Sequence, residues 1–318
     1  MVIRPARRCN QVCGNGVFVM TMENLLVSFS GGETSAFMAY WLWTHKRDQY
    51  NMVFVMANTG QENWETIVFA RNCSIHFGFK LHIVEALIDP ENRKGTKFKE
   101  INWEENIQSI STDGEPFEDM IKKYGIPNQA TPHCTRELKQ RPIEAFCKKY
   151  FNGQPYLRAI GIRIDEIDRM NAKKEKIGII YPLIYDIPMT KPKINFWWSQ
   201  QSFRLELKGY QGNCITCWKK SDKKLYQIAI DSEDYAFNFF GEMEAKYGTF
   251  IPESRLEIMK KTDKLEAVVL PITFFRKNRS AIQICQESKT FDGTVSDDSQ
   301  DFDLHNDACE VYSECADN

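Results

Sequence analysis

The chain has 318 residues, of which 42% are hydrophobic and 26% are charged, and its formal net charge is -2 at pH 7. This length predicts one large domain or a core with an appended part, and the near-neutral charge excludes a global attraction to nucleic acid or membrane surfaces. No apolar run is long enough to span a bilayer, and the run 17–20 after the N-terminal arginines is too short for a signal peptide. We therefore expect a cytoplasmic protein.

Apolar runs and helical periodicity alternate over the first part of the chain. Strands are expected at 24–30, 51–58 and 80–87, with helices at 34–47 and 63–77 between them. Strands and helices alternating at this spacing are typical of a parallel sheet with crossover helices. The expected fold class is therefore α/β.

The later part of the chain alternates less regularly. Residues 89–115 are polar and lack clear periodicity, so they are interpreted as a mobile loop over the site. The further elements expected are a helix at 135–150, strands at 156–163 and 177–184, a helix at 191–206 and two amphipathic helices within 222–247.

Four parts are expected along the chain. Residues 1–21 are interpreted as an N-terminal extension and 22–190 as the α/β core. Residues 191–285 form a mostly helical region, and 286–318 are rich in aspartate and glutamate, which is typical of a flexible acidic tail.

The first expected strand runs into Ser30-Gly31-Gly32-Glu33-Thr34-Ser35, and a helix follows. Glycines let the backbone approach phosphate oxygens, while a helix N-terminus offers N–H groups and the positive end of its dipole. The hydroxyl groups of Ser30, Thr34 and Ser35 add donors. The segment predicts a phosphate site, with a capped strand-to-helix turn as the plain structural alternative.

The same segment resembles the SGGxxS signature of the PP-loop ATP pyrophosphatases and phosphoadenosine phosphosulfate (PAPS) reductases. Further segments resemble this family in the same order along the chain, namely 58–66 (NTGQENWET), 131–142 (TPHCTRELKQRP), 161–169 (GIRIDEIDR) and 181–186 (YPLIYD). The resemblance implies that 22–190 is a PP-loop nucleotide-binding core for ATP or PAPS, with Mg²⁺.

Residue roles follow from the same resemblance. The residues implied to contact the nucleotide are Ser28, Ser30, Gly31, Gly32, Thr34, Ser35, Asn58, Thr59, Gly60, Glu62, Arg136, Lys139, Gly161, Arg163 and Arg169. Arg163 and Asp165 are the candidate catalytic residues, with Asp165 binding Mg²⁺ or positioning a nucleophile. The plain alternatives are a capped helix start at Asn63, a solvated basic helix face and a surface cluster of ion pairs.

One position departs from the family pattern. Many members carry a cation where this chain has Glu33. A carboxylate at that place repels phosphate, although it suits the helix dipole. Glu33 is therefore expected either to point outward or to hold Mg²⁺.

The segment 196–220 resembles phage and bacterial PAPS-reductase-like proteins, in which a helix leads to a GNCxxCxKK turn. The implied metal ligands are Cys134, Cys214 and Cys217. Iron–sulfur members carry two adjacent cysteines where this chain has His133-Cys134, so the fourth ligand is open. Three interpretations remain: a [4Fe-4S] cluster on three cysteines, a zinc ion that also uses His133, and a plain turn with reduced thiols.

Other cysteines have separate interpretations. Ser313-Glu314-Cys315-Ala316 resembles the C-terminal Glu-Cys-Gly motif of PAPS reductases, without its glycine and following histidine, and Cys315 is a third catalytic candidate. The surrounding aspartates disfavour its docking on a polyanionic nucleotide. Cys73 and Cys147 lie in apolar helical settings and are expected in the core.

Two branches of sulfur chemistry are implied by the resemblance. One is sulfonucleotide reduction with thioredoxin, which needs Cys315. The other is adenylation-dependent thiolation of tRNA or DNA, with sulfur from a cysteine desulfurase or a cluster. The oligomeric state is open, and a homodimer is compatible with the resemblance.

Two further functions stay open. A nucleotide-binding protein without turnover is favoured by Glu33 and the degenerate C-terminal motif. A nucleic-acid-binding module is suggested by Trp218 and the lysines that flank the CxxC turn, which are Lys219, Lys220, Lys223 and Lys224.

Overall fold

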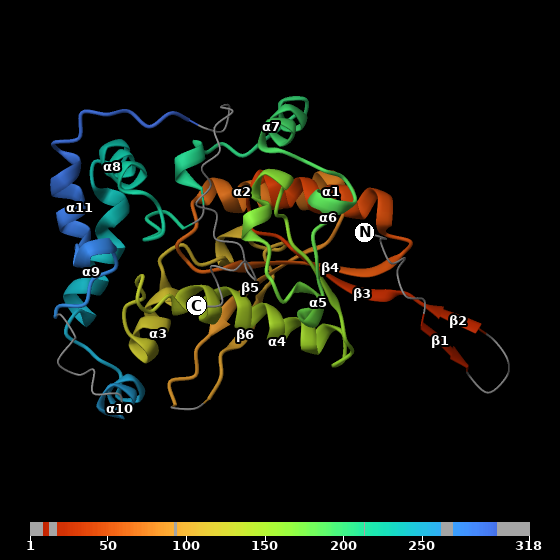
Figure 1. Cartoon of the computed structure of the whole chain (residues 1–318), viewed down its shortest axis with the longest axis horizontal. Coiled ribbons are helices and arrows are strands. Elements are labelled where there is room, and N and C mark those ends of the chain that lie inside the picture. Colours follow the sequence, from red (N-terminus) through yellow and green to blue (C-terminus); the bar gives the residue numbers. More distant parts are fainter. Residues whose placement is uncertain (1–8, 13–17, 92–93, 213, 262–269, 298–318) are drawn as a thin grey trace.

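A six-stranded sheet forms the centre of the protein in the computed structural model, which describes residues 9–12, 18–91, 94–212, 214–261 and 270–297 (Figure 1). Its strands are β3 (Glu23–Ser28), β4 (Tyr50–Asn58), β5 (Leu81–Leu87), β6 (Lys97–Ile101), β7 (Leu157–Ala159) and β8 (Ile179–Ile180). Their order is β6-β5-β4-β3-β7-β8, and only β6 runs antiparallel to its neighbour. The predicted α/β class is confirmed.

Helices cover both faces of this sheet (Figure 1). On one face lie α1 (Glu33–Lys46), α2 (Trp64–Phe77) and α7 (Lys191–Ser199), and on the other lies α4 (Arg141–Tyr150). The remaining helices are α3 (Glu115–Tyr124), α5 (Lys174–Ile177), α6 (Pro182–Tyr185), α8 (Asp222–Asp231), α9 (Asn238–Tyr247), α10 (Glu253–Lys261) and α11 (Ala281–Ser288). Short 3₁₀ turns are η1 (Ile107–Ser109), η3 (Ile164–Arg169), η4 (Gly209–Gln211), η5 (Tyr235–Phe237) and η7 (Arg276–Asn278), and η2 (Thr135–Gln140) is a π-helical turn.

Several expected elements differ from those observed. The segment 89–115 is not one loop, because it contains the edge strand β6 and the turn η1. The expected strand at 177–184 is only two residues long, since Pro182 begins α6. The expected helix at 191–206 ends at Ser199.

The expected helix at 135–150 starts with a widened turn. Arg141 N–H donates to the carbonyl oxygen of Arg136, five residues back, instead of four. Pro142 follows directly and has no N–H, and its ring would clash with a carbonyl four residues back in a regular α-helix. The proline therefore accounts for the π-helical turn that carries residues 135–140.

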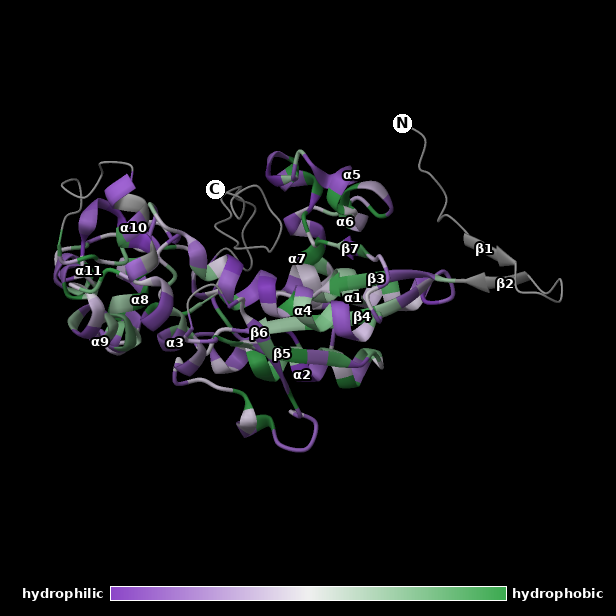
Figure 2. Ribbon diagram, turned by 90° about the horizontal axis from the view of Figure 1, so that it is seen from below, coloured by the Kyte–Doolittle hydropathy of each residue, from purple (hydrophilic) through white to green (hydrophobic). Residues whose placement is uncertain are grey.

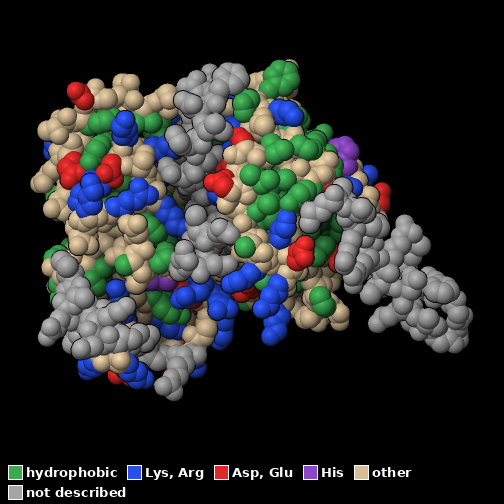
Figure 3. All heavy atoms as spheres, viewed as in Figure 1, with side chains coloured by type: hydrophobic (Ala, Val, Ile, Leu, Met, Phe, Trp, Pro, Cys, Tyr) green, Lys and Arg blue, Asp and Glu red, His purple; other side chains and the backbone are tan. Residues whose placement is uncertain are grey.

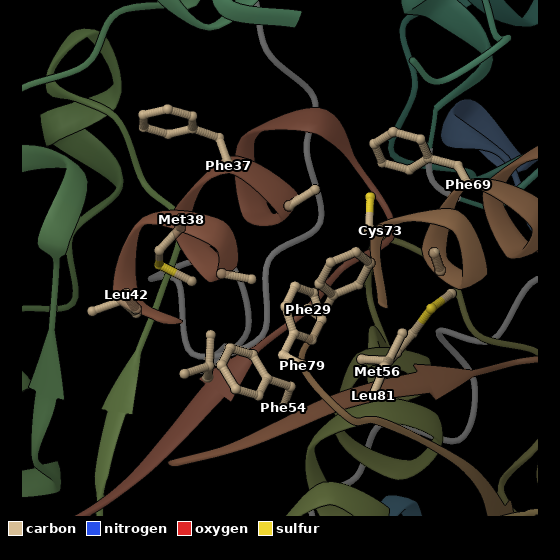
Figure 4. Packing of buried hydrophobic residues seen from close by; sticks show 14 of the residues in the cluster. Phe29, Phe37, Met38, Leu42, Phe54, Met56, Phe69, Cys73, Phe79 and Leu81 are labelled. Carbon is tan, nitrogen blue, oxygen red and sulfur yellow. The ribbon is translucent and has the colours of Figure 1, made fainter. Parts of the chain in front are cut away.

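Aromatic side chains fill the core between the sheet and α1 and α2 (Figure 4). Phe54 and Phe79 stack with ring centroids 4.4 Å apart, and Phe29 packs beside them. The thiol of Cys73 is buried in this core, and Cys147 is buried under α4 on the opposite face, where burial raises its pKa to about 12. Both cysteines are core residues, as predicted.

A second hydrophobic core lies beside the sheet, among α3, α8, α9 and α11 (Figures 1 and 2). It contains Phe240, Phe274 and Leu225 from the C-terminal helical region. Buried side chains from 117–138 also belong to it. The helical region is thus packed on residues from the first half of the chain.

Two features lie outside these cores. The short strands β1 (Cys9–Val12) and β2 (Phe18–Thr21) pair only with each other, in a two-stranded antiparallel sheet that extends from the body (Figure 1). Hydrophobic side chains gather on the surface over α1, α6 and α7, where Phe196 is 70% exposed (Figure 3). None of the helices in the described parts of the chain has the length and apolar character needed to cross a bilayer.

Candidate nucleotide site

Three neighbouring strands end at one edge of the sheet, and the predicted site segments follow them. The strands β3, β4 and β7 end at Ser28, Asn58 and Ala159, and they run parallel in the order β4-β3-β7. Ligands of open parallel sheets collect at the carboxyl ends of the strands. The fold therefore brings the segments 30–35, 58–62 and 161–169 to one edge.

The loop after β3 is closed on itself by the hydroxyl of Ser35. This hydroxyl donates to the carbonyl oxygen of Gly32 at 2.9 Å and accepts from Ser30 N–H at 3.1 Å and Ser30 Oγ at 3.0 Å. The first hydrogen bond of α1 runs from Ala36 N–H to Gly32. The N–H groups of residues 33–35 precede it and have no acceptor within the helix, which is the arrangement an anion needs.

Two glycines give this loop its shape. Gly31 has φ of +84°, and a Cβ there would lie 2.4 Å from Cγ2 of Thr66. A Cβ at Gly161 would lie 3.3 Å from Cα of Ser35, so the absence of a side chain lets the end of β7 approach the start of α1. Gly31 is needed by backbone geometry, independently of any ligand, whereas a side chain at Gly161 would press on the start of α1.

Arg163 connects the segment after β7 to the loop 30–35, the predicted phosphate site. Its Nη1 donates to Thr34 Oγ1 at 3.0 Å and lies 3.2 Å from Glu166 Oε2, and its Nε donates to Asp165 Oδ1 at 3.0 Å. Arg169 forms an ion pair with Glu166 as well. The guanidinium of Arg163 is 6% exposed and is held at the loop by this network.

Asp165 also contacts the start of α7. Its Oδ2 accepts from Lys191 N–H at 3.0 Å, so both carboxylate oxygens have partners. The structure thus joins Arg163, Asp165 and Arg169 in one network, through Glu166, and Arg163 links this network to Thr34.

Glu33 is paired with a residue that the sequence did not single out. Arg204 donates from Nε to Glu33 Oε1 and from Nη2 to Glu33 Oε2, both at 3.0 Å, and Leu205 N–H adds a contact at 3.4 Å. Trp198 Nε1 donates to the backbone carbonyl of Glu33 at 2.9 Å. Burial raises the pKa of Glu33, while the bonds to Arg204 act in the opposite direction. The carboxylate is therefore neutralised by a bidentate ion pair.

A second group of predicted residues surrounds the end of β4. Glu62 Oε2 accepts from Thr59 N–H and Thr59 Oγ1, both at 2.8 Å, and Glu62 Oε1 lies 3.5 Å from Lys139 Nζ. The glutamate side chain is 3% exposed and that of Lys139 is 12% exposed. This buried pair ties the π-helical turn to the end of β4.

Asn58 is bound within the same edge. Its Nδ2 donates to Glu85 Oε1 and to the carbonyl oxygen of Ser111, both at 2.8 Å. Gly60 N–H donates to Asn58 Oδ1 at 3.3 Å, and Gly60 has φ of +79°. The side-chain amide of Asn58 thus holds the backbone of the loop 58–62 and that of Ser111 together.

The CxxC turn docks on this loop. Ile215 N–H donates to the carbonyl oxygen of Gln61 at 2.8 Å, and Glu62 and Cys214 form an isolated antiparallel bridge. Cys214 Sγ lies 3.7 Å from Glu62 Oε1 and 3.6 Å from Thr59 Oγ1, and burial raises its pKa to about 12. The predicted cysteine turn therefore lies at the same edge as the phosphate loop.

Cys134, Cys214 and Cys217 line one cavity of about 20 Å³, together with aromatic side chains such as Trp218 and Phe240. This volume has room for about one water-sized particle, so a four-iron cluster requires the walls to move apart. Thiols are the donors that zinc and iron–sulfur clusters prefer. Among the residues the structure describes, however, no three His, Cys, Asp or Glu side chains stand close enough to hold a metal ion.

Comparison with known proteins identifies a relative. The chain is 35% identical over 209 residues to the uncharacterized nin region protein ORF290 of Escherichia phage lambda, which covers 65% of this chain and 70% of that protein. The chain belongs to the ORF290 family. No family model matches it.

A comparison with solved structures also finds a similar protein for this ORF290 family member. It is the U34-tRNA thiolase NcsA from Methanococcus maripaludis with its [4Fe-4S] cluster, matched with a TM-score of 0.35 and 15% identity over 83% of this chain and 80% of that chain.

Some predicted residues of this ORF290 family member lie apart from the loop contacts. Arg136 forms an ion pair with Glu137 at 2.7 Å, and its side chain is 50% exposed. His133 hydrogen-bonds through Nε2 to the carbonyl oxygen of Gly125, and burial lowers its pKa to about 4. It is absent from the lining of the cysteine cavity. Cys315 lies outside the described residues.

Sequence reasoning missed Arg204, Trp198, Glu85 and Ser111 at this site. Arg204 lies 171 positions from Glu33, and Ser111 lies 53 positions from Asn58. The unusual carboxylate at position 33 was the one available signal, because a buried charge needs a partner of opposite sign. That signal predicts a cation without saying where in the chain it lies.

Proposed function

We propose that the protein is a PP-loop enzyme that binds ATP or PAPS through residues 30–35 and uses the nucleotide in sulfur chemistry. The observation that carries the proposal is the shared edge of β3, β4 and β7, where a glycine loop at a helix N-terminus lies beside Arg163 and next to the docked CxxC turn. Positioning and charge stabilisation are the catalytic contributions that such a site can make.

The thiolation branch is the one we favour. In it, an oxygen of the acceptor attacks the α-phosphorus of ATP, the bond from that phosphorus to the bridging oxygen breaks, and pyrophosphate leaves. A sulfur nucleophile from a donor then displaces AMP. This branch is supported by the position of Cys134, Cys214 and Cys217 around one cavity at the edge of the sheet. The acceptor that we propose is a tRNA or DNA.

The alternative is a nucleotide-binding protein without turnover, and the structure weakens the argument for it. That argument rested mainly on the carboxylate of Glu33, which lies in the loop 30–35. Arg204 neutralises that carboxylate. Release of pyrophosphate from ATP in the presence of an acceptor separates the two functions, since the silent protein binds the nucleotide and releases none.

The loop assignment is tested by Gly32→Asp, with Gly32→Asn as its matched control. A Cβ at Gly32 meets only Ser30 Oγ, at 3.8 Å, so both side chains fit the backbone. The aspartate adds a negative charge beside the bound phosphates, and the asparagine has the same shape without the charge. We expect calorimetric titration with ATP or PAPS to lose at least about 1.4 kcal/mol of binding free energy for Asp relative to Asn. Equal affinities for both variants would remove the loop from the proposal.

A metal at the cysteines is a separate proposal. Bound zinc or iron–sulfur would be held by the thiols of Cys134, Cys214 and Cys217, which would have to rearrange from their positions in the structure. It would supply a soft Lewis-acidic or sulfur-carrying centre. No reaction step above runs through it. Anaerobic purification followed by iron, sulfide and zinc assays tests it, with Cys214→Ser as the variant that must lose the metal and Cys285→Ser as the control.

A further inference from the structure

The first turn of α1 carries a negative charge where a phosphate chain is to be bound. Glu33 directly follows Gly32, and its own N–H belongs to the helix N-terminus that faces the anion. A free carboxylate within about 8 Å of a phosphate opposes binding by roughly 2 kcal/mol at an effective dielectric constant of 20. A working site on this loop therefore needs that charge held and compensated.

Arg204, in the segment after α7, both holds the carboxylate of Glu33 in place and compensates its charge. The guanidinium of Arg204 meets the two carboxylate oxygens of Glu33 as a fork, with both distances at 3.0 Å. Side-chain exposure is 12% for Glu33 and 29% for Arg204, so water screens the pair only in part. Bidentate pairs of this kind fix direction as well as charge.

The neighbouring side chain is held by a different element. Thr34 Oγ1 accepts from Arg163 beyond β7, whereas Glu33 is held by Arg204 beyond α7. Trp198 of α7 fixes the backbone of Glu33 through its carbonyl oxygen. Glu33 and Thr34 are thus held by two separate segments of the chain.

We infer that Arg204 is a positioning residue of the nucleotide site, which makes the loop competent for a polyanion by neutralising and immobilising Glu33. The inference rests on the proposed function, because it assumes that residues 30–35 bind phosphates. Arg204 acts through Glu33 and does not need to touch the nucleotide. The pair leaves position 33 without net charge toward the bound phosphates.

A purely structural role for the ion pair makes different predictions. If Arg204 only fastened α7 to α1, then Arg204→Met would weaken all ligands alike, and a second change at Glu33 would not restore binding. If it compensates charge, the loss depends on phosphate number and disappears when Glu33 is made neutral.

The experiment uses the full chain and isothermal titration with Mg-ATP, PAPS, AMP and inorganic pyrophosphate. The variants are Arg204→Met, Glu33→Gln and the double variant, with Arg71→Met, an exposed arginine on α2, as the control for a lost positive charge. We expect Arg204→Met to weaken ATP and pyrophosphate about 10- to 30-fold and AMP less. The double variant should bind within about threefold of the wild type.

Each outcome bears on one claim. Failure of the wild type to bind ATP, PAPS and pyrophosphate overturns the proposed function itself. Binding by the wild type with no loss in Arg204→Met, or with no recovery in the double variant, overturns the role of Arg204 alone. Glu33→Gln stays measurable even if Arg204→Met does not fold. It should bind ATP at least as well as the wild type, and a loss above tenfold would instead mean that Glu33 holds the Mg²⁺ ion.

Discussion

At the edge of the sheet, the backbone geometry of position 31 requires a glycine. Gly31 adopts φ of +84°, and a methyl group there would lie 2.4 Å from Cγ2 of Thr66. We expect Gly31→Ala to lower the free energy of unfolding by about 2–4 kcal/mol, from backbone strain and overpacking together. Urea unfolding measures this loss. Adding Thr66→Ala should recover the part that comes from the clash.

The matched control for that prediction is Gly95→Ala, because a Cβ at Gly95 meets nothing within 4 Å. It should change stability by less than about 0.5 kcal/mol. An equal loss in both variants would contradict the assignment of the effect to the positive φ and the close contact at Gly31.

The buried pair of Glu62 and Lys139 gives a second prediction at this scale. Lys139→Met leaves the carboxylate of Glu62 without its ion-pair partner, in a place where the side chain is 3% exposed. The expected loss of unfolding free energy is about 2–4 kcal/mol. The double variant with Glu62→Gln should recover at least about 1 kcal/mol, since the uncompensated charge is then removed. If the stability losses of Lys139→Met and Glu62→Gln simply add in the double variant, as measured by urea unfolding, the two side chains are not directly coupled.

The sequence singled out many of the residues that lie at this edge of the sheet, but it did not predict their partners. The glycines, Ser30, Thr34 and Arg163 stand in short segments whose composition indicates an anion site. In the structure, several predicted residues bind other protein groups: Ser35 donates a hydrogen bond that closes the loop, and Lys139 forms an ion pair with Glu62. Arg204 was not predicted because its partner lies 171 positions away, and no local pattern records such a pair.

At the scale of elements, continuous apolar runs in the sequence predicted most strands of the sheet. Strands β3 and β4 are buried on both faces, so continuous apolar runs identify them. The edge strand β6 (KFKEI) is exposed at three of its five residues, and its two lysines hide the strand pattern. The π-helical turn before Pro142 was predicted as a regular helix, because the proline fixes the local hydrogen bonding without changing the periodicity.

One contact between elements gives a pH dependence. Glu244 of α9 accepts from Phe274 N–H at 2.9 Å and from Ala281 N–H at 2.8 Å, which joins α9 to the start of α11. Burial raises the pKa of Glu244 from 4.5 to about 7, although both N–H bonds act against the rise. Between these values the folded state holds a proton that the unfolded chain has released. The contribution to stability is therefore complete below pH 4.5 and is lost as the pH rises through 7.

We expect the free energy of unfolding of the wild type to fall by up to about 3 kcal/mol between pH 4.5 and 7 because of this group. Glu244→Gln should remove that part of the slope. Glu242→Gln, at an exposed position two residues earlier, is the control and should keep it. Parallel pH profiles of the wild type and Glu244→Gln in urea unfolding would show that the carboxyl titrates normally.

On the scale of the whole molecule, the sequence predicted the order of the parts along the chain. It did not predict that one hydrophobic core is built from residues of two of these parts. The boundary expected at 190/191 separates the strands, α1, α2 and α4 from α7 and the C-terminal helices. The second core crosses it, because side chains that are at most 3% exposed come from the first half of the chain. These are Phe117, Met120, Ile121, Ile126 and Leu138. Long-range packing of this kind follows from the tertiary fold and leaves no mark on local periodicity.

A fragment of residues 22–190 should therefore fail to fold as a stable monomer. It lacks the helices that cover those five side chains, and burying one such side chain contributes about 1.5–3 kcal/mol. Their sum is comparable to the whole net stability of a domain, about 5–15 kcal/mol. We expect the fragment to aggregate in size-exclusion chromatography or to bind a hydrophobic dye without cooperative unfolding. Residues 22–297 are the control and should unfold cooperatively, whereas a monomeric 22–190 fragment with a sharp urea transition would show that the sheet and its helices fold without the second core.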